Sequence, residues 1–270
     1  MLPFLRKLVL DQNRGTLYYL CEVPFSTLDI DIPYLTTAQM VEVDRLMIEQ
    51  YQIELIQMME NAGRGLALVA KERFLNNNLN GKRIVVLAGT GGNGGGAMVA
   101  ARRLASWGAA VDIFVTNTEN LTKVPRHQYD ILQNMGLSVQ EWRDNNIPFT
   151  ESVDLILDGI IGYSLSGNPR GKAKAMIEWA NRIEVPVLSL DTPSGIDLTE
   201  GKSYDPTVKA SATLTLALPK RGLRESHLRP HIGELYLADI SVPASLYAEP
   251  SLNLKVPSQL FAFSDIVRIY

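Results

Sequence analysis

The feature that most constrains the fold is an apolar run, Ile84 to Ala88, that leads directly into the glycine-rich segment 89–96. Short runs rich in β-branched residues are typical of buried strands. Seven of the eight residues in the segment are Gly or Asn, which tolerate unusual backbone angles. The apolar and small residues from Ala97 to Trp107 then predict a helix packed on a sheet. A strand, a glycine-rich loop and a helix in this order place free backbone N–H groups at a positive helix N-terminus, which suits phosphate binding.

The glycine-rich segment differs from two common phosphate-binding fingerprints. It is not G-x-G-x-x-G followed by an acidic residue near the end of the next strand, as in dinucleotide-dependent dehydrogenases. It also lacks the G-K-[ST] ending of a P-loop. A tight turn without a ligand is the alternative, but such a turn requires fewer than the six glycines found here. We therefore expect a ligand to approach this backbone closely.

From Lys82 onward, predicted strands and helices alternate along the chain. The predicted strands are 83–88, 111–116, 154–158, 186–191, 212–217 and 233–239, and the predicted helices between them are 97–107, 127–135 and 172–182. The strands are apolar throughout rather than alternating, which is typical of a parallel sheet covered on both faces. The sequence therefore predicts an α/β fold with three α/β/α layers and a Rossmann-like, mostly parallel sheet.

The two ends of the chain differ from this central part. Residues 1–35 are predicted to be an irregular N-terminal extension, because three prolines interrupt them. A capping-box pattern then starts a helix at 36–50, and a second helix is expected at 54–74. We assign residues 36–245 to one domain and residues 246–270 to a C-terminal appendage.

Composition narrows the class of protein. The chain of 270 residues is 46% hydrophobic and 20% charged, with a formal net charge of −3, which is typical of a soluble globular protein. This charge gives no general attraction to nucleic acid or to an anionic membrane, and no apolar run is long enough for a membrane span. Cys21 is the only cysteine, which excludes an internal disulfide and favours a reducing compartment. We expect a cytoplasmic protein with no nucleic-acid or membrane partner.

Three polar segments each follow a predicted strand: 89–96, 159–168 and 191–197. Because the carboxyl ends of parallel strands meet at one edge of the sheet, we expect these segments to surround one pocket. Asp158 and Asp191 would face it. The alternative for Asp158 is a cap on the turn after its strand, and the alternative for Asp191 is an Asx hydrogen bond in a proline turn.

Two carboxylates at buried strand ends require partners. A buried carboxylate costs free energy unless it is paired, hydrogen-bonded or bound to a cation. No Arg or Lys stands beside either aspartate in the sequence. A hard monovalent or divalent cation held by oxygens of Asn93, Asp158 and Ser194 would meet this requirement.

Several motifs together resemble a known family. Residues 58–64, MMENAGR, resemble its helical M-E-N-A-G motif. The glycine-rich segment, the turn at 158–162, the D-x-P-S-G sequence at 191–195 and the PKRGL sequence at 219–223 follow in the same order at compatible spacing. Over residues 35–245 the chain therefore resembles the YjeF N-terminal family, the NAD(P)H-hydrate epimerases, which are also called apolipoprotein A-I-binding proteins.

The resemblance implies an isomerase of metabolite repair that interconverts the R and S epimers of hydrated NADH or NADPH at ring carbon C6. It implies that Asn93, Asp158 and Ser194 hold a potassium ion, and that Asp191 contacts the substrate and acts as the acid or base. Lys220 would either steer phosphate or be a solvated turn residue, and we expect a homodimer. The residues expected at the substrate site are Gly92, Asn93, Gly94, Gly95, Gly96, Gly162, Tyr163, Ser164, Leu165, Ser166, Gly167, Asn168 and Asp191.

The glycine-rich segment departs from the family pattern. The family has G-x-G-N-N-G-G-D-G, whereas this chain has Gly92, Gly96 and Ala97 in place of the first Asn, the Asp and the last Gly. This departure supports an alternative of another class, a catalytically silent scaffold that binds nucleotide or dimerises. An NAD-dependent oxidoreductase is disfavoured because the dinucleotide fingerprint is missing.

Overall fold

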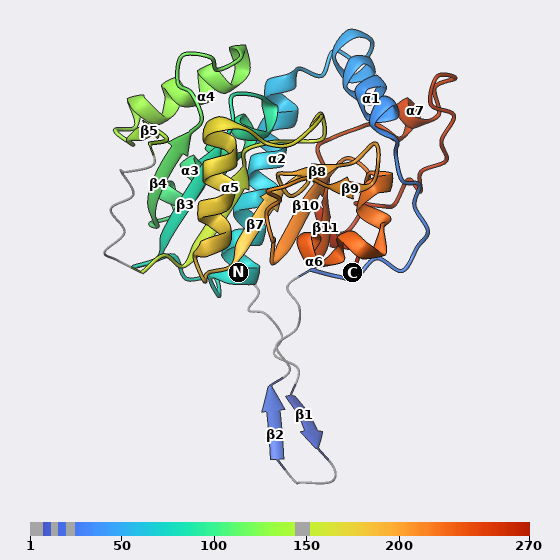
Figure 1. The fold of residues 1–270 in the computed structure, drawn as a ribbon. Helices are drawn as coiled ribbons and strands as arrows, with labels where there is room; N and C mark the ends of the chain where they lie inside the picture. Colours follow the sequence, from blue (N-terminus) through green and yellow to red (C-terminus); the bar gives the residue numbers. More distant parts are fainter. Residues whose placement is uncertain (1–7, 12–15, 20–24, 144–151) are drawn as a thin grey trace.

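The computed structural model describes residues 8–11, 16–19, 25–143 and 152–270, and it describes side chains in the last two ranges. Cys21 lies outside the described residues. Most of the described chain forms one large sheet with helices on both of its faces (Figure 1). Among the described residues, no helix combines the length and apolar character required to cross a membrane.

The central sheet has eight strands in the order β12-β11-β10-β7-β6-β3-β4-β5. The strands are β3 (Arg83–Ala88), β4 (Ala110–Val115), β5 (Val139–Glu141), β6 (Leu155–Gly159), β7 (Val187–Leu190), β10 (Ala212–Leu216), β11 (Glu234–Ala238) and β12 (Ile266–Arg268). All neighbours pair in parallel except β12, which is antiparallel to β11. The predicted α/β fold with a mostly parallel sheet is confirmed.

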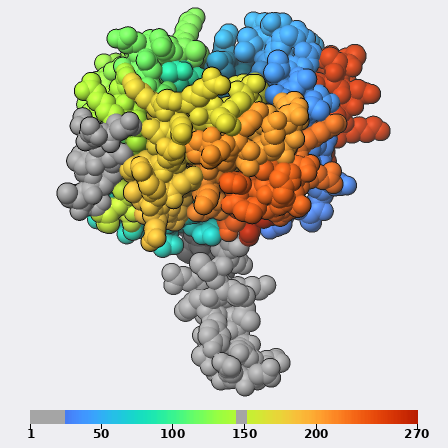
Figure 2. All heavy atoms as spheres, in the orientation of Figure 1, coloured from blue at the N-terminus to red at the C-terminus, as the bar shows by residue number. Residues whose placement is uncertain are grey.

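Alternate residues of β3 show that the sheet is covered on both faces. Ile84 and Val86 belong to the buried cluster that includes helices α2 (Leu55–Val69) and α3 (Gly92–Ser106). Val85 and Leu87 belong to a second cluster that includes α5 (Gly171–Arg182). The helices therefore form one layer on each side of the sheet (Figure 1), and in Figure 2 the yellow α5 region faces the viewer beside the orange residues that follow it.

The helices begin close to where the sequence predicts. Helix α1 (Thr37–Glu49) starts with the expected capping box, in which Thr36 and Gln39 bond each other's backbone N–H groups. Helix α2 continues into the π-helical turn η1 (Ala70–Phe74). Helix α4 (Lys123–Asn134) starts earlier than the predicted 127–135, because Pro125 lies in its first turn, where proline is tolerated. The remaining short elements are β8 (Ile196–Asp197), β9 (Lys202–Ser203), the 3₁₀ turns η2 (Arg221–Arg224) and η3 (Ser226–Leu228), α6 (Arg229–Ile232) and α7 (Ala244–Tyr247).

The glycine-rich segment is not a loop over its full length, and this prediction is wrong. Helix α3 begins at Gly92 rather than at Ala97, with Gly91 as its N-cap. The glycines allow close packing: a Cβ on Gly94 would lie 2.0 Å from the carbonyl oxygen of Gly89, and a Cβ on Gly95 would lie 2.5 Å from the sulfur of Met59. The first turns of α3 therefore pack against the β3 loop and α2 at distances that a larger side chain prevents.

The ends of the chain are more regular than predicted. Within the segment 1–35, β1 (Leu8–Asp11) and β2 (Thr16–Tyr19) pair antiparallel as a separate two-stranded sheet. Phe25 and Leu35 are buried in the main core, and Leu35 exchanges backbone hydrogen bonds with Pro219 and Arg221. At the other end, residues 266–268 close one edge of the central sheet as β12. Both ends thus contribute to packing around the domain core.

Candidate active site

A cavity of about 760 Å³ lies at the carboxyl ends of β3, β6 and β7. Its wall includes residues 89–93 after β3, residues 160–164 after β6, and Leu190 and Asp191 at the end of β7. Helices α1 and α2 contribute further side chains. All three predicted polar segments contribute to the pocket region, although the third does so through Asp191 alone. This is the edge of a parallel sheet where ligands bind in α/β folds.

The glycine-rich segment reaches the cavity through only part of its length. Gly92 and Asn93 line the cavity, whereas Gly94, Gly95 and Gly96 are buried. Positions 92 to 94 open the helix, so their N–H groups lack a partner four residues earlier in it. Gly95 N–H donates to the carbonyl of Gly91 at 3.0 Å, which removes it from substrate binding. A phosphate site at this helix start would therefore use the first turn only.

The predicted loop 159–168 also divides into two parts. Gly162, Tyr163 and Ser164 line the cavity. The other predicted contacts, Leu165, Ser166, Gly167 and Asn168, are not among the residues that line it. Asn168 instead accepts a long hydrogen bond from the backbone N–H of Asp205, at 3.5 Å.

Asp158 is completely buried and is held by four neutral donors. Its Oδ1 accepts from Ser194 Oγ at 2.6 Å and from Ile160 N–H at 3.2 Å. Its Oδ2 accepts from Ser189 Oγ at 2.8 Å and from Ser194 N–H at 2.9 Å. Burial raises the pKa of the Asp158 carboxyl, and these hydrogen bonds lower it only in part. The turn-capping alternative for Asp158 is thus realised, and its hydrogen-bonding needs are met by the protein.

Of the three predicted cation ligands only Asn93 lines the cavity, so the prediction that Asp158 faces it is wrong. Asp158 and Ser194 are buried and contact each other directly. Asn93 Nδ2 donates to the Leu190 carbonyl at 3.0 Å, while Asn93 Oδ1 makes no hydrogen bond within the described residues. Its side chain faces Gly162, where a Cβ would lie 3.6 Å from Asn93 Oδ1. The set of Asn93, Asp158 and Ser194 offers only oxygen ligands, and the contacts of Asp158 supply no positive charge. A bound cation would supply the positive charge that the four neutral donors to Asp158 do not.

Asp191 is the most unusual residue of the site. It is 3% exposed and adopts a left-handed backbone conformation, with φ of 64°, which is rare for a residue other than glycine. Its Oδ1 forms a buried ion pair with the ammonium of Lys220 and accepts a long hydrogen bond from Thr215 Oγ1, at 3.4 Å. Its Oδ2 makes no hydrogen bond within the described residues, and Asp191 is one of the residues that line the cavity. Strained, charged residues of this kind are concentrated at functional sites.

The position of Lys220 differs from the sequence-based predictions in two respects. It is 1% exposed, so the prediction of a solvated turn residue is wrong. Its ammonium also donates to the Leu216 carbonyl at 3.0 Å, and its backbone forms an isolated parallel β-bridge with Leu35. The partner of Asp191 was missed because it follows another strand, β10, rather than standing beside the aspartate in the sequence. A buried carboxylate requires a partner, and this requirement was the signal that could have pointed to Lys220.

A second carboxyl group reaches the cavity from α1. Asp44 lines the wall and accepts a hydrogen bond from the hydroxyl of Tyr163 at 2.7 Å. The sequence reading assigned Asp44 no role, because it lies on a helix outside the sheet. Met58 and Met59 of α2 are buried, and they also form part of the apolar wall of the cavity.

The sequence model of the YjeF-related protein N-terminus family matches residues 55–222. The chain belongs to this family. A protein of Dehalogenimonas lykanthroporepellens named NAD(P)H-hydrate epimerase is 41% identical over 224 residues, which are 83% of this chain and 88% of the relative. A bifunctional NAD(P)H-hydrate repair enzyme of Moorella thermoacetica is 32% identical over 87% of this chain, which spans 45% of that relative.

The fold is also that of a solved yeast protein. The crystal structure of yeast YNL200c superposes with a TM-score of 0.75 over 88% of this chain and 100% of the yeast chain, at 23% identity. This similarity supports the three-layer fold. The matched family region contains the glycine-rich segment, Asp158, Asp191 and Lys220.

Proposed function

We propose that this protein is an NAD(P)H-hydrate epimerase, which interconverts the R and S epimers of hydrated NADH or NADPH. The observation that carries the proposal is Asp191, a strained carboxylate paired with Lys220 in the wall of a cavity large enough for a ligand. Relatives named for this activity support it, including one that is 41% identical.

The cavity combines the surfaces that a hydrated dinucleotide requires. The start of α3 offers N–H groups for phosphate, and Arg170 and Lys172 add positive charge to the wall. The side chains of Met58, Met59 and Ile160 offer apolar surface to rings. We propose that the phosphates lie over Gly92 and Asn93, with the hydrated ring toward Asp191.

Epimerisation at C6 requires the hydroxyl to leave and water to return on the other face of the ring. The departing hydroxyl takes a proton and leaves as water, while the ring nitrogen supplies the electron pair that forms a double bond to C6. Water then adds to C6 from the opposite face and gives up a proton. A carboxyl such as Asp191, which lines the cavity and has one oxygen held by Lys220 and the other without a hydrogen bond within the described residues, suits such proton transfer.

We propose that Asn93, Asp158 and Ser194 hold a potassium ion. Their oxygen-only chemistry and the uncompensated charge of buried Asp158 support this assignment. The ion would supply positive charge beside the substrate phosphates and the aspartates.

Gly96, which replaces the family's aspartate, is buried and is not among the residues that line the cavity. A Cβ at this position would meet the end of the Leu190 side chain, at 2.6 Å from Cδ2. The substitution therefore removes no group from the cavity wall and does not by itself favour the silent scaffold.

The proposal is tested by incubating purified protein with the R-hydrate and a dehydratase specific for the S-hydrate. We expect R-hydrate to be consumed much faster than it epimerises alone. Consumption at the uncatalysed rate would refute the enzymatic activity, and ligand binding without turnover would favour the scaffold. We further propose a cytoplasmic homodimer that binds neither nucleic acid nor membrane, which light scattering and binding to DNA and anionic vesicles would check.

A further inference from the structure

Asp44 and Tyr163 form a pair in the cavity wall that has no part in the proton transfer proposed for Asp191. Asp44 lies in α1, and Tyr163 lies in the loop after β6. The Tyr163 hydroxyl donates to Asp44 Oδ2 at 2.7 Å, whereas Oδ1 makes no hydrogen bond within the described residues. One oxygen of this carboxyl is therefore fixed and the other has no such partner, in a residue that lines the cavity.

The surroundings of Asp44 differ from those of Asp191. The titratable groups that act on Asp44 are the phenol of Tyr163 and, through space, the charges of Lys220 and Asp191. Burial raises the pKa of Asp44, while the Tyr163 hydrogen bond and Lys220 oppose the rise. The ammonium of Lys220 contacts Asp191 directly. Two carboxyl groups in one cavity with unlike surroundings can divide the roles of acid and base.

The geometry of epimerisation requires proton transfer on both faces of the ring. A carboxyl that reaches the hydroxyl of one epimer lies on the wrong side of a flat ring for the hydroxyl of the other. Asp191 enters the cavity from the end of β7, whereas Asp44 enters it from α1, outside the sheet. The two groups thus approach the cavity from different elements.

We infer that Asp44 is a second acid–base residue, which serves the ring face opposite to Asp191 and is positioned by Tyr163. This inference rests on the proposed epimerase function. For one epimer, Asp191 protonates the leaving hydroxyl, the C6–O bond breaks, and water departs as the ring nitrogen forms its double bond to C6. A water on the other face then attacks C6, and its proton passes to the Asp44 carboxylate. For the reverse reaction the two residues exchange roles, and solvent restores their protonation.

Oxygen exchange with solvent tests this inference separately from overall turnover. The epimers are incubated in ¹⁸O-labelled water with wild type, Asp44→Asn or Asp191→Asn, and mass spectrometry follows label in each epimer. We expect Asp44→Asn to lower epimerisation by a factor of about 10² or more. It should still exchange the hydroxyl of the epimer that faces Asp191 and lose exchange of the other, and Asp191→Asn should give the reverse pattern.

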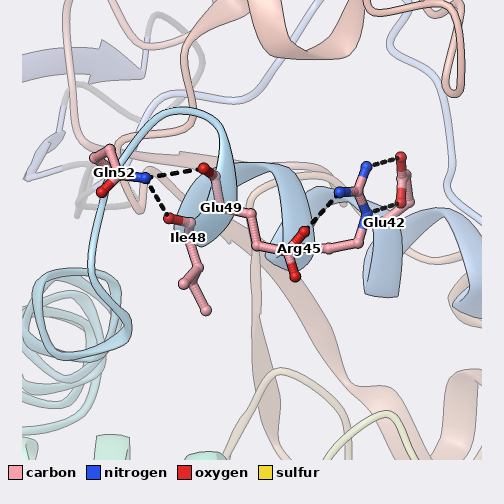
Figure 3. A network of polar contacts seen from close by, with 5 residues as sticks. All are labelled: Glu42, Arg45, Ile48, Glu49 and Gln52. Carbon is pink, nitrogen blue, oxygen red and sulfur yellow. Dashed lines mark hydrogen bonds and ion pairs between the residues drawn. The ribbon is translucent and has the colours of Figure 1, made fainter.

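A matched control lies on the same helix. Glu49 belongs to the exposed network of Glu42, Arg45, Glu49 and Gln52 in Figure 3, where Arg45 Nη1 lies 2.7 Å from its carboxylate. Glu49→Gln should keep both exchange reactions and epimerisation. Tyr163→Phe should show the Asp44→Asn pattern in weaker form, because it removes the hydroxyl that positions the carboxyl.

Three results would overturn the inference. Asp44→Asn could retain epimerisation within about threefold of wild type, or it could lose exchange of both epimers equally while remaining folded by circular dichroism. If Asp44→Asn does not fold, an unchanged exchange pattern in Tyr163→Phe overturns the inference. Wild type without epimerisation would instead refute the proposed function and this inference with it.

Discussion

Replacing Asp191 by Asn should destabilise the protein as well as abolish turnover. The sequence alone predicts a loss of turnover with an intact fold, but the structure places Lys220 in a buried ion pair with Asp191. The substitution leaves the ammonium buried without its counter-charge. Removing one partner of a buried pair typically costs about 3–5 kcal/mol.

Two remaining contacts place the expected loss of stability in Asp191→Asn at the lower end of this range. The Lys220 ammonium keeps its hydrogen bond to the Leu216 carbonyl, which is 3.0 Å long in the structure, and the Asn side chain offers an amide oxygen. We therefore expect a loss of about 3 kcal/mol in the free energy of unfolding. For a protein of this size each kcal/mol lowers Tm by about 2–4 °C, so Tm should fall by about 6–12 °C.

A double variant separates the charge effect from the loss of the side chain. Asp191→Asn combined with Lys220→Met removes both charges, and we expect it to recover most of the lost stability but no turnover. Urea unfolding and calorimetry of the wild type, both single variants and the double variant measure the coupling. The reasoning is refuted if Asp191→Asn unfolds within about 1 kcal/mol of wild type, or if the double variant is less stable than either single variant.

Three further predictions follow from other contacts. Gly63→Ala should lower stability by about 2 kcal/mol in a thermal melt, because its Cβ would lie 2.4 Å from Val99 Cβ, whereas Gly92→Ala, with open space around its Cβ, should not. Burial raises the pKa of Asp44 above its unfolded value of about 4. Just above that pH the folded protein therefore keeps the Asp44 proton more often than the unfolded chain does. Wild type should therefore lose stability relative to Asp44→Asn as pH rises from about 4 toward 7, and a constant difference in urea unfolding would contradict this. Potassium chloride should raise Tm more than choline chloride at equal ionic strength, and Asp158→Asn should remove the difference.

Local sequence signals predicted the core of the fold because they coincide with the buried strands. The run 84–88 is apolar at every position, and its alternate residues pack into the two buried clusters on opposite faces of the sheet. β5 and β12 have three residues each, and such short runs carry little local signal. They are strands because β4 and β11 offer an edge to pair with, which is a property of the tertiary structure.

The site was predicted where residues follow strands and was missed where partners come from elsewhere. Asp158 lies near the end of β6, Asp191 follows β7 and Asn93 opens α3 after β3, so the topology of a parallel sheet places all three at one edge. Lys220 is 29 residues from Asp191, and Asp44 is 119 residues from Tyr163. Neither contact leaves a periodic or spacing signal, because each depends on how a loop or helix folds back over the sheet edge.

The most direct test of the account is a crystal structure of the protein with hydrated NADPH and potassium. We expect the phosphates over the start of α3 at Gly92, and C6 of the ring within reach of the Asp191 and Asp44 carboxyl groups. A nucleotide bound elsewhere on the protein, or a ring turned away from Asp191, would contradict it.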